Sequence, residues 1–137
     1  MIFESEKRIY DRSNNEYSYS EWILDTDKRM IVHTDENLKV TEHWFYKDFI
    51  GYHLDYRTEK CSGVLRDLVN DGKILEYLEE LEIKVTDAIN EQAEIWINES
   101  KEYQIALNKG NLYDVNRIGN IFIADAKDIV YKAMVYV

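Results

Sequence analysis

The stretch ILEYLEELEIKVTDAINEQAEI, residues 74–95, decides the fold of this chain. Its apolar positions are separated by alternating steps of four and three residues, the heptad repeat of a helix that packs against another helix. Gln92 occupies one position of the repeat, and the others are Ile74, Leu78, Leu81, Val85, Ala88 and Ile95. We therefore expect one long helix with a narrow apolar stripe that needs a partner.

A matching repeat near the C-terminus supplies this partner. Its positions are Leu112, Val115, Gly119, Phe122, Ala126, Ile129, Ala133 and Tyr136. Two matching seams joined by a short connector predict an antiparallel helical hairpin. The seams could close within one chain or between two, so a homodimer stays open, with Gln92 specifying the register.

Residues 1–45 have a different character. Residues 1 to about 20 are polar and contain the turn signal Ser13-Asn14-Asn15, which predicts an extended arm or a short edge strand. Three β-prone runs follow at 22–24, 30–32 and 38–45, separated by turn-forming residues, and they predict a small antiparallel meander. In the third run Leu38, Val40 and Trp44 form an apolar face that Glu42 interrupts.

The segment between the meander and the hairpin changes to a helical period. Phe49, Tyr52 and Tyr56 share one face of a helix beginning near Lys47. Cys61-Ser62-Gly63 predicts a break, and a second amphipathic piece over 64–69 ends at the turn signal Asn70-Asp71-Gly72.

Capping residues mark the remaining helix boundaries. The long helix runs to about Asn98, and Ser100 caps a short helix over 101–108, which Lys109-Gly110 ends. Asn111, with Asp114 three residues on, caps the last helix, which runs almost to Val137. The sequence thus predicts a mainly α fold of the α+β class, with a β meander packed on a helical hairpin. We expect a single domain, 1–137, with a β-rich part at 1–45 and a helical part at 46–137.

Composition restricts the partners. The net charge of −10 repels nucleic acid and anionic membranes and attracts basic protein surfaces. The alternative is that the charge serves only solubility. The chain has a lone cysteine, no apolar core of signal-peptide length and no long apolar run. We therefore expect a cytoplasmic protein that contacts neither membranes nor nucleic acid directly.

No catalytic motif is visible in the chain. His33, His43 and His53 match no metal-ligand spacing, and no glycine-rich phosphate loop occurs. Cys61 has His53 and Asp55 upstream, but a nucleophile needs its base close in space, which proximity in sequence does not supply. We therefore expect no catalytic residue, no metal ligand and no cofactor, with an enzyme using Cys61 or a histidine pair as the weakest alternative.

The acidic surface of the long helix is the stronger signal. Nine acidic and two basic residues lie between Ile74 and Glu102, which accounts for seven of the ten excess negative charges. Those at helical spacing along one outward face are Glu76, Glu80, Asp87, Glu91 and Glu94. Like charges four residues apart destabilise a helix slightly, so a purely structural helix gains nothing from them. We predict that this face binds a partner, with a solvated charged face as the alternative.

Aromatic residues form a second excess, with 11 tyrosines and 3 tryptophans. Tyrosine and tryptophan dominate the energetic hot spots of protein interfaces. Tyr103 and Tyr113 are our candidates for further contacts with the partner.

From Gly51 to the C-terminus the chain resembles the TnpV family, small proteins encoded on bacterial transposons and related mobile elements. The matching residues of the first part are His53-Leu54, Tyr56, Leu65, Leu68, Gly72-Lys73-Ile74 and Tyr77-Leu78. Those of the last helix are Val115-Asn116-Arg117-Ile118-Gly119-Asn120-Ile121, Ala126, Ile129-Val130 and Val135-Tyr136. The resemblance implies a mobile-element setting and carries over no catalytic residue.

Two binding functions follow from these features. The first is a non-catalytic mobile-element protein that blocks a nucleic-acid-handling protein through its acidic helix face, as an anti-CRISPR or other anti-defence inhibitor and DNA mimic would. Its partner would have a basic nucleic-acid-binding surface, as a CRISPR nuclease has. The second is a transposition accessory protein that assembles with other transposon proteins. A basic surface would favour the second, and only Lys7-Arg8, Arg12 and Lys28-Arg29 offer one.

Overall fold

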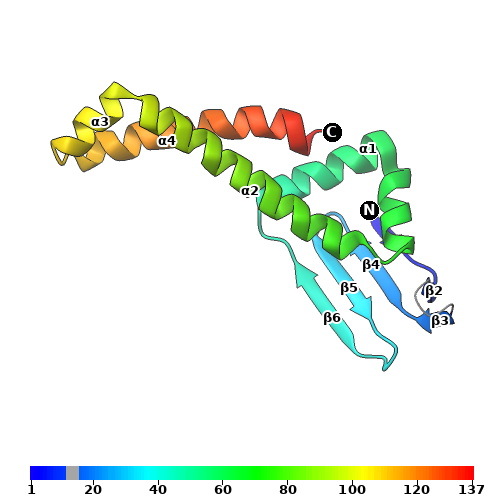
Figure 1. Ribbon diagram of the computed structural model, residues 1–137. Helices are drawn as coiled ribbons and strands as arrows, with labels where there is room; N and C mark the ends of the chain where they lie inside the picture. Colours follow the sequence, from blue (N-terminus) through cyan, green and yellow to red (C-terminus); the bar gives the residue numbers. More distant parts are fainter. Residues whose placement is uncertain (12–15) are drawn as a thin grey trace. The chain divides into compact units, whose positions relative to one another are not determined.

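The computed structural model describes residues 1–11 and 16–137, and within them the fold is α+β, as predicted (Figure 1). A four-stranded antiparallel sheet comes first and four helices follow. The predicted turn at Ser13-Asn14-Asn15 lies outside the described residues.

The predicted meander is confirmed. It consists of β4 (Glu21–Asp25), β5 (Met30–Thr34) and β6 (Val40–Trp44), and the sheet order is β1-β4-β5-β6. The first strand, β1 (Ile2–Glu4), pairs antiparallel with β4 and is the edge strand expected in the N-terminal arm. A separate ladder joins β2 (Arg8–Asp11) to β3 (Glu16–Tyr19).

Aspartates build both turns of the meander. Asp25 Oδ1 accepts hydrogen bonds from the backbone N–H groups of Asp27 and Lys28, and Asp35 Oδ1 accepts from those of Asn37 and Lys39. An aspartate side chain that closes a turn on its own backbone is a common way to connect two strands. The turn-forming residues between the predicted strands therefore do what the sequence indicates.

The faces of β6 differ from the expectation. The inner face of the sheet carries the buried side chains of Phe3, Leu24 and Ile31, and Ile31 is paired with His43. His43 is therefore on the inner face of β6, while the predicted apolar face of Leu38, Val40 and Trp44 is exposed. The register with β5 decides which face is buried, because a shift of one residue exchanges the two faces.

The first helix, α1 (Asp48–Asn70), contacts β1 and β4. It is interrupted at Cys61, whose backbone has non-helical dihedral angles, so the predicted break is confirmed. The helix ends at Asn70, and the turn after it contains Gly72, which has a φ of +70° and donates its N–H to the carbonyl oxygen of Val69.

The long helix α2 (Ile74–Glu99) is followed by α3 (Lys101–Asn108) and α4 (Leu112–Val130). Both predicted caps are confirmed, since Ser100 accepts from the N–H of Tyr103 and Asn111 from that of Asp114. A π-helical turn at Tyr131–Val135 ends the last helix.

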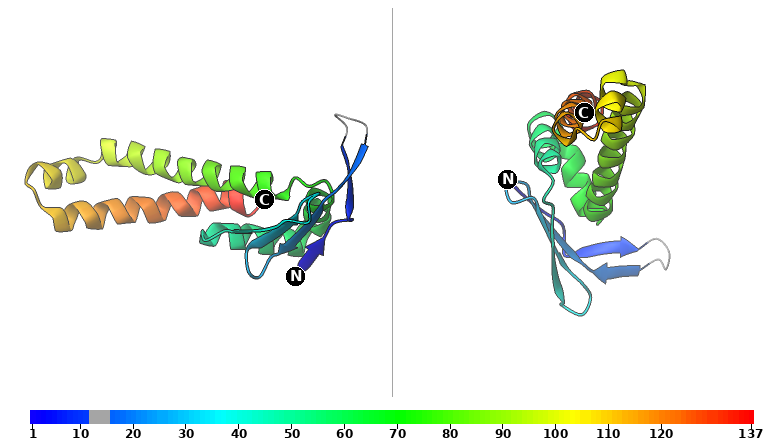
Figure 2. Two further views of the ribbon diagram at one scale, coloured as in Figure 1. Left: turned by 90° about the horizontal axis from the view of Figure 1, so that it is seen from below. Right: turned by 90° about the vertical axis from the view of Figure 1, so that its left-hand side faces the viewer.

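The described chain forms two compact units. The first comprises Met1–Glu82 and Tyr136–Val137, and the second comprises Ile83–Val135, so α2 contributes residues to both. In the second unit α3 contacts α4, and α4 runs antiparallel to the second part of α2 (Figure 2). The single domain predicted from the sequence stays a prediction.

The strict heptad seam is only partly right. Ile74, Leu78 and Val85 are buried as expected, but further along α2 the buried residues are Ile89 and Ala93, while Ile95 is exposed. A straight α-helix has 3.6 residues per turn and drifts away from a 3.5-residue repeat, so the buried stripe moves by one position. In the C-terminal repeat Leu112, Ile129 and Tyr136 are exposed, whereas Ala126 is buried as expected.

Gly110 allows a direct test of the α3–α4 turn, because its φ of +68° disfavours any residue with a Cβ. We expect Gly110→Ala to lower the free energy of unfolding by about 1 kcal/mol. The matched control is Gly63→Ala, at an exposed helical position that also has no atom near the added Cβ. It should leave stability unchanged or raise it by up to about 1 kcal/mol. Urea unfolding of the two variants measures the difference, and equal effects would contradict the assigned turn.

Candidate protein-binding surface on α2

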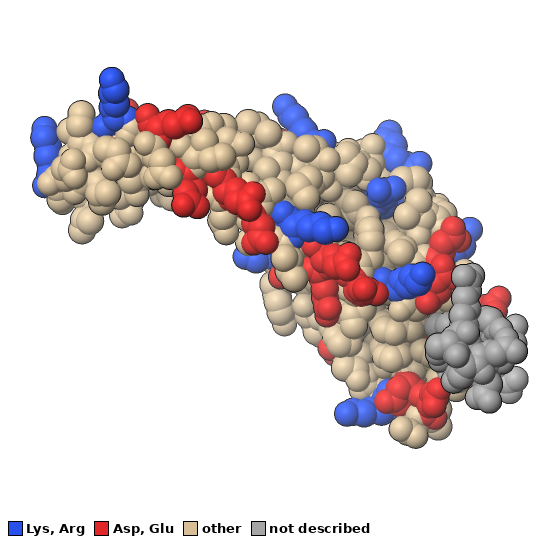
Figure 3. Space-filling view, in the orientation of Figure 1, with Lys and Arg blue, Asp and Glu red and all other residues tan. Residues whose placement is uncertain are grey.

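The five predicted acidic residues of α2 are all exposed, and Figure 3 shows carboxylates gathered along this helix. At 100° per residue they fall within an arc of about 60°. We call the side chains of Glu76, Glu80, Asp87, Glu91 and Glu94 the acidic face. The arc lies opposite Val85, which is fully buried, so packing of the apolar stripe directs the carboxylates into solvent.

Cations do not neutralise the second part of this face. No lysine or arginine in the described part of the chain forms an ion pair with Asp87, Glu91 or Glu94. By contrast, Arg117 lies 3.1 Å from Glu102 and 3.6 Å from Asp114, so those carboxylates have an intramolecular partner. The acidic face is therefore a concentration of negative charge that a basic surface can approach.

Ile83 is a residue of this surface that the sequence analysis missed. It is 62% exposed and lies on the same side of α2 as Glu80 and Asp87, which are three residues before it and four after it. An isoleucine outside the heptad positions of an amphipathic helix is the signal that could have identified it. Its side chain is an exposed apolar group beside the carboxylates.

The two candidate tyrosines differ in their surroundings. Tyr113 is 77% exposed at the start of α4. Tyr103 is half-buried, and its ring lies 3.8 Å from the point where a Cβ on Gly119 would stand. Tyr103 therefore contributes to the packing of α3 on α4, and Tyr113 is the freer of the two side chains. A partner-binding role for either stays a prediction.

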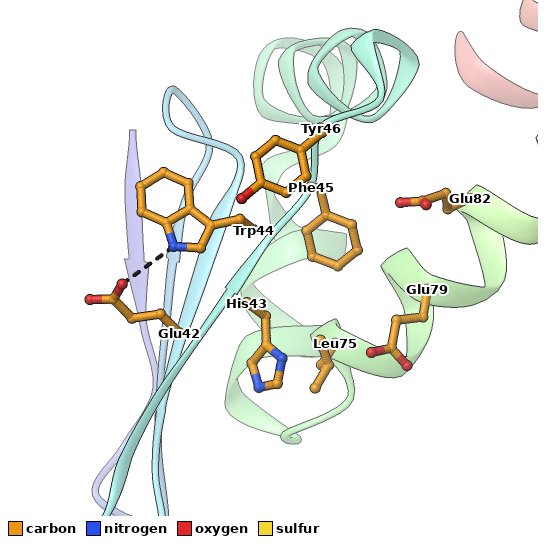
Figure 4. A pocket seen from close by; sticks show the side chains of 8 residues that line it. All are labelled: Glu42, His43, Trp44, Phe45, Tyr46, Leu75, Glu79 and Glu82. Atoms are coloured by element: carbon orange, nitrogen blue, oxygen red, sulfur yellow. Dashed lines mark hydrogen bonds between the residues drawn. The ribbon is translucent and has the colours of Figure 1, made fainter.

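Two of the possible catalytic residues, His53 and Cys61, are linked through their partners, because Tyr77 and Arg57 also interact with each other. His53 is 1% exposed, and its Nε2 atom lies 2.6 Å from the hydroxyl of Tyr77. Arg57 donates a hydrogen bond to the Cys61 sulfur at 3.2 Å. His43 instead lines a pocket between β6 and α2 (Figure 4). Among the described residues, His43 forms no hydrogen bond with His53 or Cys61, so the link between His53 and Cys61 does not include the third residue named for an enzyme.

Two further observations concern metal ions and membranes. The His, Cys, Asp and Glu side chains that the structure describes include no group of three suited to a metal ion. Within residues 1–11 and 16–137, no helix has the length and apolar character needed to cross a membrane.

Some of the basic residues considered for contact with DNA have an internal partner or lie outside the described part of the chain. Arg29 lies 3.4 Å from Asp48 and is thus engaged within the chain. Arg12 lies outside the described residues.

Comparisons of the chain with protein-family models, with curated proteins and with solved structures give no match. The resemblance to the TnpV family therefore stays a prediction.

The contact between His53 and Tyr77 leads to a prediction of how the stability of the protein depends on pH. Burial raises the pKa of Tyr77 above its ordinary value of 10.0, and the nearby Arg57 opposes this increase. The folded protein therefore keeps the phenolic proton at a pH where the unfolded chain loses it, so the associated stability is present below pH 10 and is lost as the pH rises further.

We expect Tyr77→Phe to lower the free energy of unfolding by about 1 kcal/mol at neutral pH, because His53 loses a buried hydrogen-bond partner. This difference from the unaltered protein should shrink as the pH rises above 10.0. Urea unfolding of both proteins across that range measures the difference. A stability difference between the two proteins that stays constant or grows above pH 10.0 would contradict the raised pKa of Tyr77.

Proposed function

We propose that this protein is a non-catalytic binding protein whose acidic face on α2 occupies a basic nucleic-acid-binding surface of a partner protein. The observation that carries the proposal is the exposed arc of Asp87, Glu91 and Glu94, which have no cationic partner in the described part of the chain.

The energetics of the helix support a role in binding. Asp87 and Glu91 are four residues apart, so they repel each other by a few tenths of a kcal/mol. Such an arrangement does not stabilise α2, and an approaching positive charge would offset the repulsion. Carboxylates one turn apart are separated by about 6 Å along the axis of a rigid helix, which presents a regular row of negative charge.

The biological setting rests on the resemblance to the TnpV family. We infer a protein of a transposon, plasmid or prophage that inhibits a host nucleic-acid-handling protein, with a CRISPR nuclease as the concrete target. The acidic face would compete with DNA for the basic channel of the nuclease, in the manner of an anti-CRISPR inhibitor. A homodimer and a role in transposition stay predictions.

A competition assay tests this proposal. A CRISPR nuclease with its guide RNA is bound to a fluorescein-labelled DNA duplex, and the protein is titrated while fluorescence anisotropy is recorded. We expect displacement of the duplex, and the triple variant Asp87→Asn, Glu91→Gln, Glu94→Gln should need at least about tenfold more protein.

The matched control removes three charges elsewhere. Glu4→Gln, Glu36→Gln and Asp67→Asn change exposed carboxylates on other elements and alter the net charge equally. This control variant should displace the duplex as the unaltered protein does. Equal losses in both variants would show that net charge alone matters and would contradict a defined acidic face.

A variant at Ile83 measures the contribution of apolar contact to binding separately from that of charge. Truncation by Ile83→Ala should weaken displacement by about tenfold, because several buried carbon atoms are lost from the interface. The slope of affinity against salt concentration should stay the same, whereas the triple charge variant should reduce that slope. The same titration at several salt concentrations measures both. An unaltered affinity for Ile83→Ala would place Ile83 outside the interface.

A further inference from the structure

A hollow of about 460 Å³ lies within the first unit between β6 and the first part of α2. Figure 4 shows the side chains of Phe45 and Leu75 between the strand and the helix, with Glu79 and Glu82 pointing from α2 toward the strand. Phe45 is almost fully buried and forms an apolar floor. The hollow therefore has an apolar base and two carboxylates on its helical wall.

The other wall is the open edge of the sheet. The lining residues of β6 and its extension are consecutive, from Glu42 to Tyr46, so the backbone of the strand borders the hollow. Strand β6 is the last in the sheet order β1-β4-β5-β6 of the described chain. One edge of β6 therefore has no neighbouring strand among the described residues.

The register shows which backbone groups face this open edge. Phe45 donates its N–H to the carbonyl oxygen of Arg29 at 2.9 Å, which identifies a hydrogen-bonded pair of the β5–β6 ladder. Hydrogen-bonded and non-hydrogen-bonded pairs alternate along an antiparallel ladder, so the backbone N–H and C=O groups of His43 also face β5. The N–H and C=O groups of Glu42 and Trp44 point away from β5. These outward groups are a template for an additional strand.

Charge determines what kind of strand fits. An added strand would lie about 4.8 Å from β6. Every second side chain on it would then face the wall of the hollow that carries Glu79 and Glu82. Neither carboxylate has an ion-pair partner among the described residues. An apolar or acidic side chain would leave these charges unpaired, whereas arginine or lysine would pair with both.

We propose that the edge of β6 and the hollow beside it bind an extended, arginine-rich segment of a partner protein by strand addition. Backbone hydrogen bonds to Glu42 and Trp44 would position the segment, and its alternate basic side chains would reach Glu79 and Glu82. This site lies on a different side of α2 from the acidic face, so it goes beyond the function proposed above and stands or falls separately.

The test uses the peptide fluorescein-Arg-Val-Arg-Val-Arg-Val-amide, labelled at its N-terminus, in which all arginines share one face when the peptide is extended. We expect salt-sensitive binding to the full-length protein by fluorescence anisotropy, and no binding of the peptide in which glutamate replaces arginine. The variant Glu79→Gln, Glu82→Gln should bind at least about tenfold more weakly.

Glu42 allows the backbone contribution to be isolated. Glu42→Pro removes an N–H that points away from β5, so it should leave the β5–β6 ladder intact and weaken peptide binding at least about tenfold. The matched control Glu42→Thr also removes the carboxylate but keeps the N–H, so the difference between Glu42→Pro and Glu42→Thr isolates the backbone hydrogen bond, and Glu42→Thr should bind at least about tenfold more tightly than Glu42→Pro. Circular dichroism of each variant verifies the fold.

The same experiment tests whether the site beside β6 binds the peptide independently of the acidic face. The variant Asp87→Asn, Glu91→Gln, Glu94→Gln should keep full peptide affinity. Absence of binding, or equal binding by the Glu79→Gln, Glu82→Gln variant, would overturn the proposed site. Equal affinity of Glu42→Pro and Glu42→Thr would overturn strand addition.

Discussion

Burial of one stripe of α2 determines the surfaces that this protein presents. Ile74, Leu78 and Val85 are fully buried, and a helix with one stripe so constrained cannot rotate about its axis without exposing them. The orientation of every other side chain on α2 follows from this constraint. The acidic face lies opposite the stripe, and Glu79 and Glu82 lie between the two.

The same constraint gives the two proposed sites different physical characters. The acidic face is a convex row of carboxylates on a helix, with Ile83 among them, and it suits a broad basic surface. The site beside β6 is concave and has a backbone edge as one wall, so it suits a narrow extended segment. In both proposals charge would attract a basic partner, while shape and backbone hydrogen bonding would distinguish the two partners.

Local signals in the sequence predicted most of the fold. Ser100 and Asn111 cap helices in the structure, and Gly72 and Gly110 lie in the turns that follow helices, because these positions depend on the chemistry of a few neighbouring residues. The three strands of the meander were also recognisable, since their turns are closed by Asp25 and Asp35 within the same few residues.

Features that depend on tertiary packing were not predictable in the same way. The buried face of β6 depends on its register with β5, and the alternation of Leu38, Val40 and Trp44 indicated the wrong face. The exact heptad positions failed at Ile95 because the helix follows its own period over many turns. The acidic residues were identifiable from their spacing, but Ile83 and the hollow beside β6 required the fold.

The central claim is that the acidic face of α2 contacts a basic nucleic-acid-binding surface. Carboxylate footprinting tests it most directly, by coupling exposed carboxylates to glycine ethyl ester with and without a DNA-free CRISPR nuclease and measuring each residue by mass spectrometry. We expect Asp87, Glu91 and Glu94 to become protected while Glu4, Glu36 and Asp67 react as before. Unchanged labelling of α2 in a complex that has formed would contradict it.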